Sequence, residues 1–127
     1  MRFSLEIRYP DYDAKGHVNN AVYLTYFEIA RARAWTGPLG GAETDIPFIV
    51  AEASVRYVSE AKIGDPLDIE MRTAEIRNKA WVWTYRVLDP RDERLVAEGR
   101  TVQVMYDYEA HQTVPIPADM RLRLESV

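Results

Sequence analysis

Residues 21–36, AVYLTYFEIARARAWT, decide the fold, because they are the one long helical pattern in the chain. Apolar side chains occur almost all round this segment, and charged residues interrupt it at few positions. A helix that is apolar on nearly every side is normally enclosed by the rest of its protein. Gly37-Pro38 predicts where the helix ends, and Asn19 or Asn20 is the expected N-cap.

On both sides of this helix the apolar pattern changes to a period of two, which is typical of half-buried strands. Before it, Phe3, Leu5 and Ile7 alternate with polar residues, and Pro10 ends the predicted strand. A loop is expected over residues 9–20 and a second one, rich in Gly and Pro, over 37–47. Four further strands are predicted, over residues 49–57, 67–71, 81–87 and 94–106.

Short connections join the four later strands and favour an antiparallel sheet. Turns are expected at Asn78-Lys79 and at 89–92, and Gly99 marks a bulge or bend in the last strand. The tail, 115–127, allows a short helical turn. The predicted class is therefore α+β in a single domain over residues 1–127. One helix covers one face of the sheet, and because the other face is expected to carry aromatic residues, we expect self-association through the sheet or its edge.

Charge and composition exclude several classes of protein. The chain has 127 residues, with 16 Lys and Arg against 20 Asp and Glu, so its net charge of −4 argues against nucleic-acid binding. It has no Cys, which excludes disulfides and thiol catalysis, and two His argue against a His-rich metal site. Charges interrupt both the N-terminal apolar pattern and the helix. We therefore expect no signal peptide, no membrane span and a cytoplasmic protein.

The chemistry is expected just before the helix, where Asp13 and Gly16 precede its first turn. The first turn of a helix has unpaired N–H groups and a partial positive charge, which can stabilise a developing oxyanion. A carboxylate a few residues upstream would suit attack on an activated carbonyl. The same residues also fit structural roles: Asp13 as a turn former, Asn19 and Asn20 as caps, and His17 as a structural hydrogen-bonding residue.

Taken together, residues 8–31, RYPDYDAKGHVNNAVYLTYFEIAR, resemble the acyl-CoA thioesterases of the 4-hydroxybenzoyl-CoA thioesterase family, which have the hot-dog fold. A second block, VAEASVRYVSEAKIGDPL over residues 50–67, agrees in position. The resemblance implies a curved antiparallel sheet wrapped around the long helix. It also implies a homodimer or homotetramer with its active site at the dimer interface. The substrate would be an acyl-CoA or acyl-ACP, hydrolysed to free acid and thiol. Coenzyme A would be part of the substrate, with no other cofactor and no metal.

The resemblance also assigns roles to single residues. Asp13 matches the family's catalytic aspartate, which acts as a nucleophile or as a general base. The backbone N–H of Asn20 matches the group that polarises the thioester carbonyl. Tyr9 matches a position where some members carry a functional tyrosine, and packing is its alternative role. Some members carry His where this chain has Asn20, and there it pairs with the aspartate.

In this chain the histidine is His17, three residues before Asn20, so the Asp–His pairing of those members is not expected. Gly16 would let the loop approach the substrate closely. His17 and Asn19 would shape the loop or lie beside the substrate.

Two kinds of substrate contact are expected from the resemblance. Tyr23, Phe27, Tyr57 and the 37–47 loop would line an apolar pocket for the acyl group. The phosphates of coenzyme A would need cations near strand ends and turns, although each of these residues also fits a solvated surface charge. The candidate cations are Arg56, Lys62, Arg77, Lys79, Arg91 and Arg94.

Two other functions remain open from sequence. A hot-dog enoyl-CoA hydratase would have Asp and His in a later loop with Asn-Pro, whereas His111 lies in a Glu-Ala-His-Gln tail. A stand-alone acyl-CoA-binding protein would bind its ligand without turnover.

Overall fold

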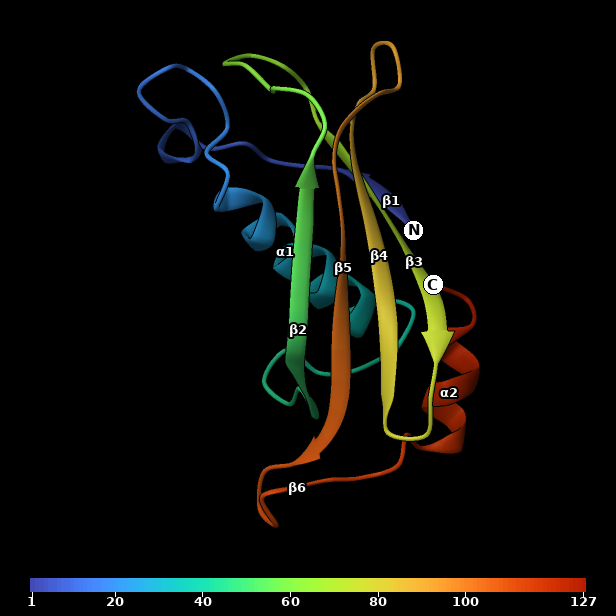
Figure 1. Ribbon diagram of the computed structural model, residues 1–127. Coiled ribbons are helices and arrows are strands. Elements are labelled where there is room, and N and C mark those ends of the chain that lie inside the picture. Colours follow the sequence, from blue (N-terminus) through green and yellow to red (C-terminus); the bar gives the residue numbers. More distant parts are fainter.

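The computed structural model describes all residues, 1–127, and contains one six-stranded sheet with a long helix packed on it (Figure 1). The strand order is β1-β3-β4-β5-β2, and β6 pairs with β5; every pairing is antiparallel. The predicted α+β class and the hot-dog architecture are confirmed. The elements are β1 (Arg2–Ser4), the 3₁₀ turn η1 (Tyr9–Asp11), α1 (Val22–Thr36), β2 (Phe48–Tyr57), β3 (Asp68–Ile76), β4 (Ala80–Asp89), β5 (Arg94–Asp107), β6 (Gln112–Thr113) and α2 (Ala118–Leu124).

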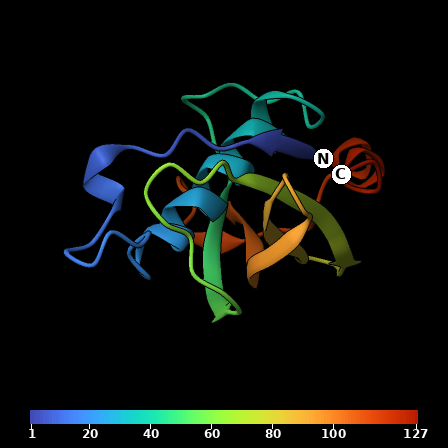
Figure 2. The same cartoon turned by 90° about the horizontal axis from the view of Figure 1, so that it is seen from above.

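Helix α1 lies across one face of the sheet, as the view from above shows (Figure 2). Its sheet-facing side is fully buried, and the ring of Phe27 stacks on that of Tyr85 of β4 with 4.3 Å between centroids. Its other side is not enclosed in a single protomer, because Leu24 is 41% exposed and Ile29 36% exposed. The expected all-round burial is therefore wrong for one side of the helix. No helix is long and apolar enough to cross a membrane.

Gly99 does not form a bulge. It pairs in regular register with Tyr85, and the irregularity between β4 and β5 lies between Val87 and Leu88. A Cβ at Gly99 would overlap the Phe27 ring. The glycine therefore lets α1 approach the sheet closely at this point. The change of apolar face in β5 comes from the bulge, which precedes Gly99.

The two faces of the sheet differ more than the sequence predicted. Trp81, Trp83 and Tyr85 all lie on the helix side and are buried. The expected aromatic residues on the other face are therefore absent from the centre of the sheet. That face instead carries one row of alternating charge, because the register places the following residues side by side across five strands: Arg2, Glu70, Arg86, Glu98 and Arg56. Such cross-strand pairs of opposite charge support the register.

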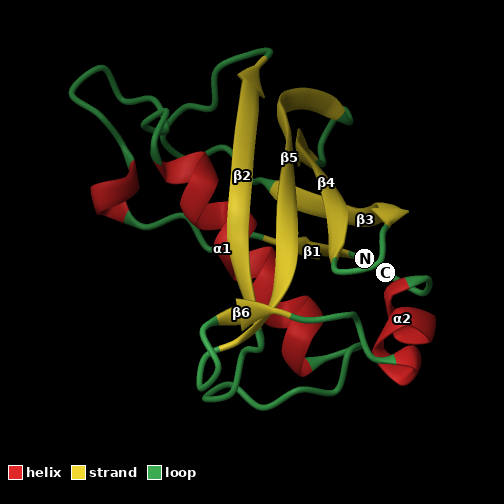
Figure 3. Cartoon of the chain, turned by 60° about the horizontal axis from the view of Figure 1, so that its bottom comes forward, coloured by secondary structure: helices red, strands yellow, loops and turns green.

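Strand β2 forms one edge of the sheet, and its outer backbone groups have no partner within the protomer (Figure 3). A bulge between Val50 and Glu52 shifts its alternation, so that the predicted apolar face of residues 49–57 is continuous only after the bulge. Its apolar side chains are poorly covered: Val50 is 41% exposed and Tyr57 49% exposed. A long edge strand with exposed apolar side chains is a template for pairing with another strand.

β1 and α2 both lie beside β3. β1 is shorter than the predicted strand and includes Phe3 but not Leu5 or Ile7. The expected turn in the tail is the helix α2, which buries Met120 and Leu124 beside β3. The two termini lie close together in Figure 1.

Candidate active site

The loop before α1 folds into a small hairpin that presents Asp13. Tyr12 bridges to Val18 across the hairpin, and Asp13 N donates to the carbonyl of His17 at 2.8 Å. Gly16 closes the turn with φ of +75°, in the left-handed region that favours glycine. The close approach to the substrate that the resemblance implies for Gly16 stays a prediction.

The Asp13 carboxylate has one oxygen held and one free. Its Oδ1 accepts hydrogen bonds from the backbone N–H of Lys15 at 2.9 Å and from that of His17 at 3.2 Å. Its Oδ2 has no partner in the protein. The hydrogen bond from the His17 N–H, more than that from Lys15, lowers the pKa of Asp13 below its ordinary value. Asp13 is therefore an anion at neutral pH, with one oxygen available to a ligand or a water.

The start of α1 contributes a free backbone donor beside this carboxylate. Asn20 N makes no hydrogen bond within the chain. The following peptide is held at both ends, because Tyr57 Oη donates to Asn20 O at 2.7 Å and Ala21 N donates to Asn19 Oδ1 at 3.0 Å. The N-cap position belongs to Ala21, with no side-chain cap, so the prediction of Asn19 or Asn20 there is wrong. Asn19 instead forms a turn just before the helix.

These groups share one open cavity of about 370 Å³ at the N-terminal end of α1. Its walls come from the Asp13 hairpin, the first turn of the helix, the end of β2 and the segment after it. The lining residues are Asp13, His17, Val18, Asn20, Tyr23, Tyr57, Val58, Ser59 and Glu60. Asp13, His17, Asn20, Tyr23 and Tyr57, all expected at the site, therefore do come together.

Glu60 is a second carboxylate in this cavity, and no local pattern in the sequence marked it as a site residue. His17 Nε2 lies 2.9 Å from Glu60 Oε2, and Lys62 Nζ lies 3.3 Å from Oε1. Backbone hydrogen bonds from Val18 N to Ala61 O and from Ile63 N to Gly16 O join the two loops. His17 is thus paired with Glu60 from another loop, which fits the expectation that it does not pair with Asp13 as a side chain.

Two predicted site residues lie elsewhere. Phe27, expected to line the acyl pocket, is fully buried between α1 and the sheet, because Gly99 lets it stack on Tyr85. Tyr9, expected to orient substrate or water, is 86% exposed on η1 and does not line the cavity. The 37–47 loop, also expected at the acyl pocket, follows the other end of α1 in the same protomer (Figure 1).

The candidate phosphate-binding cations are mostly paired with carboxylates. Arg56 Nη2 lies 2.6 Å from Glu98, and Lys62 contacts Glu60. Arg91 and Arg94 both contact Asp89 and Asp65. These four residues lie at the same end of the sheet as the cavity. Arg77, paired with Glu75, and Lys79 lie at the β3–β4 turn, at the opposite end (Figure 1).

This arrangement suits addition to a polarised carbonyl. A carbonyl oxygen placed at the start of α1 would accept from Asn20 N and feel the positive end of the helix dipole. Asp13 Oδ2 opens to the same cavity and could act on the carbonyl carbon directly or through a water. The chain contains no group of three His, Asp or Glu side chains that could hold a metal ion.

Curated relatives match almost the whole chain. Long-chain acyl-CoA thioesterase FadM of Escherichia coli (strain K12) is 24% identical over 134 residues, covering 100% of this chain and 98% of FadM. Acyl-CoA thioester hydrolase YbgC of Escherichia coli O6:H1 is 27% identical over 112 residues, covering 84% of this chain and 82% of YbgC.

Solved structures agree with the fold. A thioesterase from Thermus thermophilus, complexed with coenzyme A and Zn, has a TM-score of 0.87 at 28% identity, covering 99% of this chain and 94% of that one. A 1,4-dihydroxy-2-naphthoyl-CoA thioesterase from Synechocystis has a TM-score of 0.87 at 16% identity, covering 97% and 93%, and supports the fold alone.

The family model described as the thioesterase-like superfamily matches residues 7–124, a span that includes the Asp13 hairpin and every strand of the sheet except β1. The family and the enzyme class predicted from the sequence are thereby confirmed: the chain belongs to the thioesterase-like superfamily and is a thioester hydrolase.

Proposed function

We propose that this protein hydrolyses the thioester of an acyl-CoA to a free acid and coenzyme A, with Asp13 as the reacting carboxylate. This proposal rests on one observation: two groups without partners in the protein, Oδ2 of Asp13 and the N–H of Asn20, belong to residues that line the same cavity. The names of the acyl-CoA thioesterases FadM and YbgC support the substrate class.

For the chemical step, the reaction requires only the carboxylate of Asp13 and the N–H of Asn20 from the chain. The thioester oxygen accepts from Asn20 N, which stabilises the negative charge that develops when the carbonyl carbon is attacked. In one route Asp13 takes a proton from a water that adds to the carbon. In the other, Asp13 Oδ2 adds first, and water then hydrolyses the resulting anhydride. In the first route the C–S bond then breaks, and the protonated Asp13 returns its proton to the leaving thiolate. In the second, the C–S bond breaks as the anhydride forms and the thiolate takes a proton from solvent, after which water cleaves the anhydride to the free acid and the Asp13 carboxylate.

Other residues of the cavity would position the substrate. The rings of Tyr23 and Tyr57 meet edge to face at 5.5 Å and form an apolar wall for the acyl group. Arg56, Lys62, Arg91 and Arg94 would have to exchange a carboxylate partner for a phosphate in order to bind coenzyme A. An acyl-ACP would deliver the same thioester to the same cavity.

We further propose that two protomers pair through the β2 edge, as the resemblance implied. The exposed apolar side chains of β2 and its unpaired backbone groups support this interface. Antiparallel pairing would bring the start of one β2, with the 37–47 loop before it, toward the end of the other β2. The cavity would then be completed by the partner. Light scattering should give two or four times the protomer mass of 14.7 kDa, and a monomer would contradict the proposal.

The decisive experiment is Asp13→Asn, assayed by release of free thiol from acyl-CoAs of different chain lengths and from aromatic acyl-CoAs. Loss of a general base or nucleophile should lower kcat by about 10²–10⁴-fold. The matched control is Asp119→Asn, exposed on α2 and outside the cavity, which should keep full activity. Turnover by Asp13→Asn equal to that of the parent would contradict the assignment of Asp13.

The same assay separates the two other functions. A non-catalytic binding protein would bind acyl-CoA in stoichiometric amount, and neither the parent nor Asp13→Asn would release thiol. An enoyl-CoA hydratase would consume an enoyl-CoA without releasing thiol. Either result would overturn the proposed hydrolysis.

A further inference from the structure

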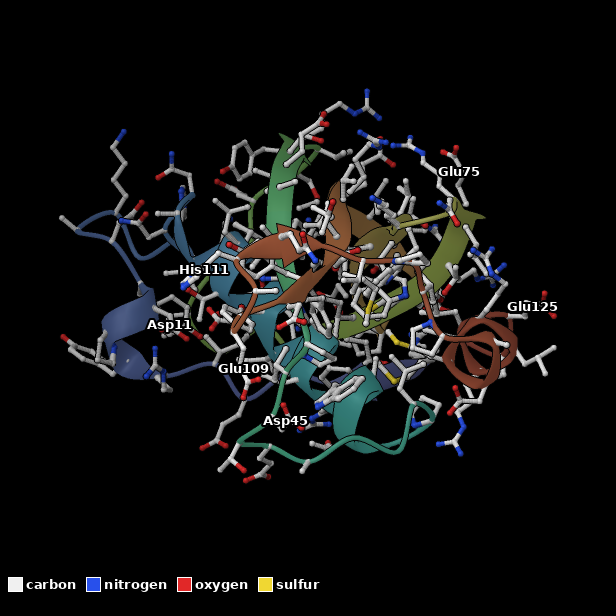
Figure 4. All side chains as sticks on the ribbon, turned by 90° about the horizontal axis from the view of Figure 1, so that it is seen from below. Asp11, Asp45, Glu75, Glu109, His111 and Glu125 are labelled. Atoms are coloured by element: carbon white, nitrogen blue, oxygen red, sulfur yellow. The ribbon has the colours of Figure 1, made fainter.

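Asp11 is a buried carboxylate that takes no direct part in the proposed hydrolysis. It is 2% exposed and lies at the end of η1, in the loop before α1 (Figure 4). Its Oδ2 accepts from Arg8 N at 3.0 Å and from the hydroxyl of Tyr26 at 3.1 Å. Its Oδ1 accepts from Arg8 Nη2 at 3.0 Å. Unlike Asp13, Asp11 has both oxygens occupied by the protein itself.

A buried charge of this kind contributes little to stability. Removing a carboxylate from water is costly, and even good partners do no more than offset that cost. Burial opposes ionisation of Asp11, but the hydrogen bonds from Arg8 and Tyr26 outweigh it and lower the pKa of this carboxyl. Buried ionic groups have been found to fix geometry in some proteins. The contacts of Asp11 show which geometry it fixes here.

Asp11 makes two contacts that fix the hairpin, one to helix α1 and one to the far end of the hairpin itself. Its side chain is held by Tyr26, which is buried in the second turn of α1. Its backbone carbonyl accepts from Asn19 N at 2.8 Å, so the same residue also holds the far end of the hairpin. Between these two attachments lies Asp13, and directly after Asn19 comes the free N–H of Asn20. A shift of Asp11 would therefore move the carboxylate and the donor relative to one another.

We propose that Asp11 is a positioning residue, which, anchored by Tyr26, sets the distance and orientation of Asp13 relative to the N–H of Asn20. This inference rests on the proposed function for its effect on turnover. Its structural part does not depend on the proposed function: the hydrogen bond from Tyr26 holds Asp11, and Asp11 holds the hairpin, an attachment that we call the clamp. Reactions between well-oriented groups lose rate steeply when the orientation is relaxed. Weakening the clamp should therefore lower kcat without a matching change in the binding of substrate.

The experiment is Tyr26→Phe, which removes one oxygen and keeps the buried ring. Its matched control is Tyr85→Phe, which removes another buried hydroxyl, one that is hydrogen-bonded to Thr101 Oγ1 at 2.7 Å and makes no hydrogen bond to the hairpin. Both variants should lose similar thermal stability. Tyr26→Phe should lose about tenfold in kcat, equivalent to about 1.4 kcal/mol, with KM within about twofold of the parent. Tyr85→Phe should keep its kcat. Equal kcat values for the two variants would overturn the proposal.

Amide hydrogen exchange tests the clamp independently of activity. The amides of Asn19 and His17, which are bonded to Asp11 O and Asp13 Oδ1, should exchange faster in Tyr26→Phe than in the parent and in Tyr85→Phe. Unchanged exchange would overturn the clamp even if turnover falls. If the parent hydrolyses no acyl-CoA, the proposed function fails, whereas faster exchange in Tyr26→Phe would still support the clamp.

Discussion

The two ends of helix α1 use their polar groups in opposite ways. At the C-terminal end the groups are paired: Gly37 N donates to Arg33 O at 2.9 Å, and Trp35 Nε1 donates to Ala42 O at 2.8 Å. At the N-terminal end, Asn20 N and one oxygen of Asp13 have no partner in the protein. Because helix ends normally need partners for their backbone groups, an end that leaves a donor free beside an open cavity is suited to bind a ligand.

We expect the C-terminal end of α1, where the polar groups are paired, to lose stability when side-chain volume is added and to tolerate the loss of a charged group. In Gly41→Ala the new Cβ would overlap the Trp35 ring, so the ring or the loop must shift. Overpacking of this kind costs about 1–3 kcal/mol, which corresponds to a drop in Tm of roughly 3–15 °C for a domain of this size. Thermal unfolding followed by circular dichroism measures it. Glu43→Ala in the same loop is the control, and the comparison fails if both variants unfold at the same temperature.

We expect the N-terminal end of α1, beside the cavity, to lose activity when a single hydrogen bond is removed. Tyr57→Phe removes the donor to Asn20 O and keeps the aromatic wall of the cavity. A single hydrogen bond is worth about 0.5–1.5 kcal/mol, so kcat should fall by about 2–10-fold and Tm should change little. Tyr106→Phe, whose hydroxyl makes no hydrogen bond within the chain, is the control. A fall in Tm with unchanged kcat would show that the bond serves the fold and not the reaction.

The smallest expected effect concerns pH. The pKa of Asp13 lies below its ordinary value of 3.8, because the N–H of His17 stabilises the anion. A carboxyl with a lowered pKa stays ionised as pH falls and loses its charge only as pH passes below that value. The kcat/KM should therefore show no acid limb assigned to Asp13 between pH 7 and about 5. Tryptophan fluorescence at each pH gives the folded fraction, and an acid limb near pH 6 in folded protein would contradict this expectation.

Local patterns in the sequence were enough for α1 and the long strands. The apolar segment before Gly37 predicted α1 to within one residue at its start, and the period of two predicted the long strands. The cluster around Asp13 and Asn20 predicted a site at the start of the helix. Each of these depends on neighbours within a few residues, which is the range over which period, capping and turn formation act.

The errors concern contacts between residues far apart in the chain. Whether Phe27 lines a pocket or fills the core depends on Gly99, which lacks the Cβ that would block it. Glu60 reaches the site because two loops pair through their backbones, and no local pattern marks that pairing. A bulge moves every later side chain to the other face of a strand, so the period alone could not place the apolar face of β2.

The sequence by itself therefore determined that this protein has one long helix, an antiparallel sheet and a carboxylate before a helix start. Only the tertiary structure decided that Asp13 has a free oxygen whereas Asp11, two residues earlier, has none. The two residues are chemically identical. Arg8 donates to both oxygens of Asp11, and Tyr26 adds a third hydrogen bond from α1. The contact with Tyr26 spans 15 residues and depends on how the loop packs against the helix. Packing of that kind decides which polar groups are satisfied by the protein and which remain available for chemistry.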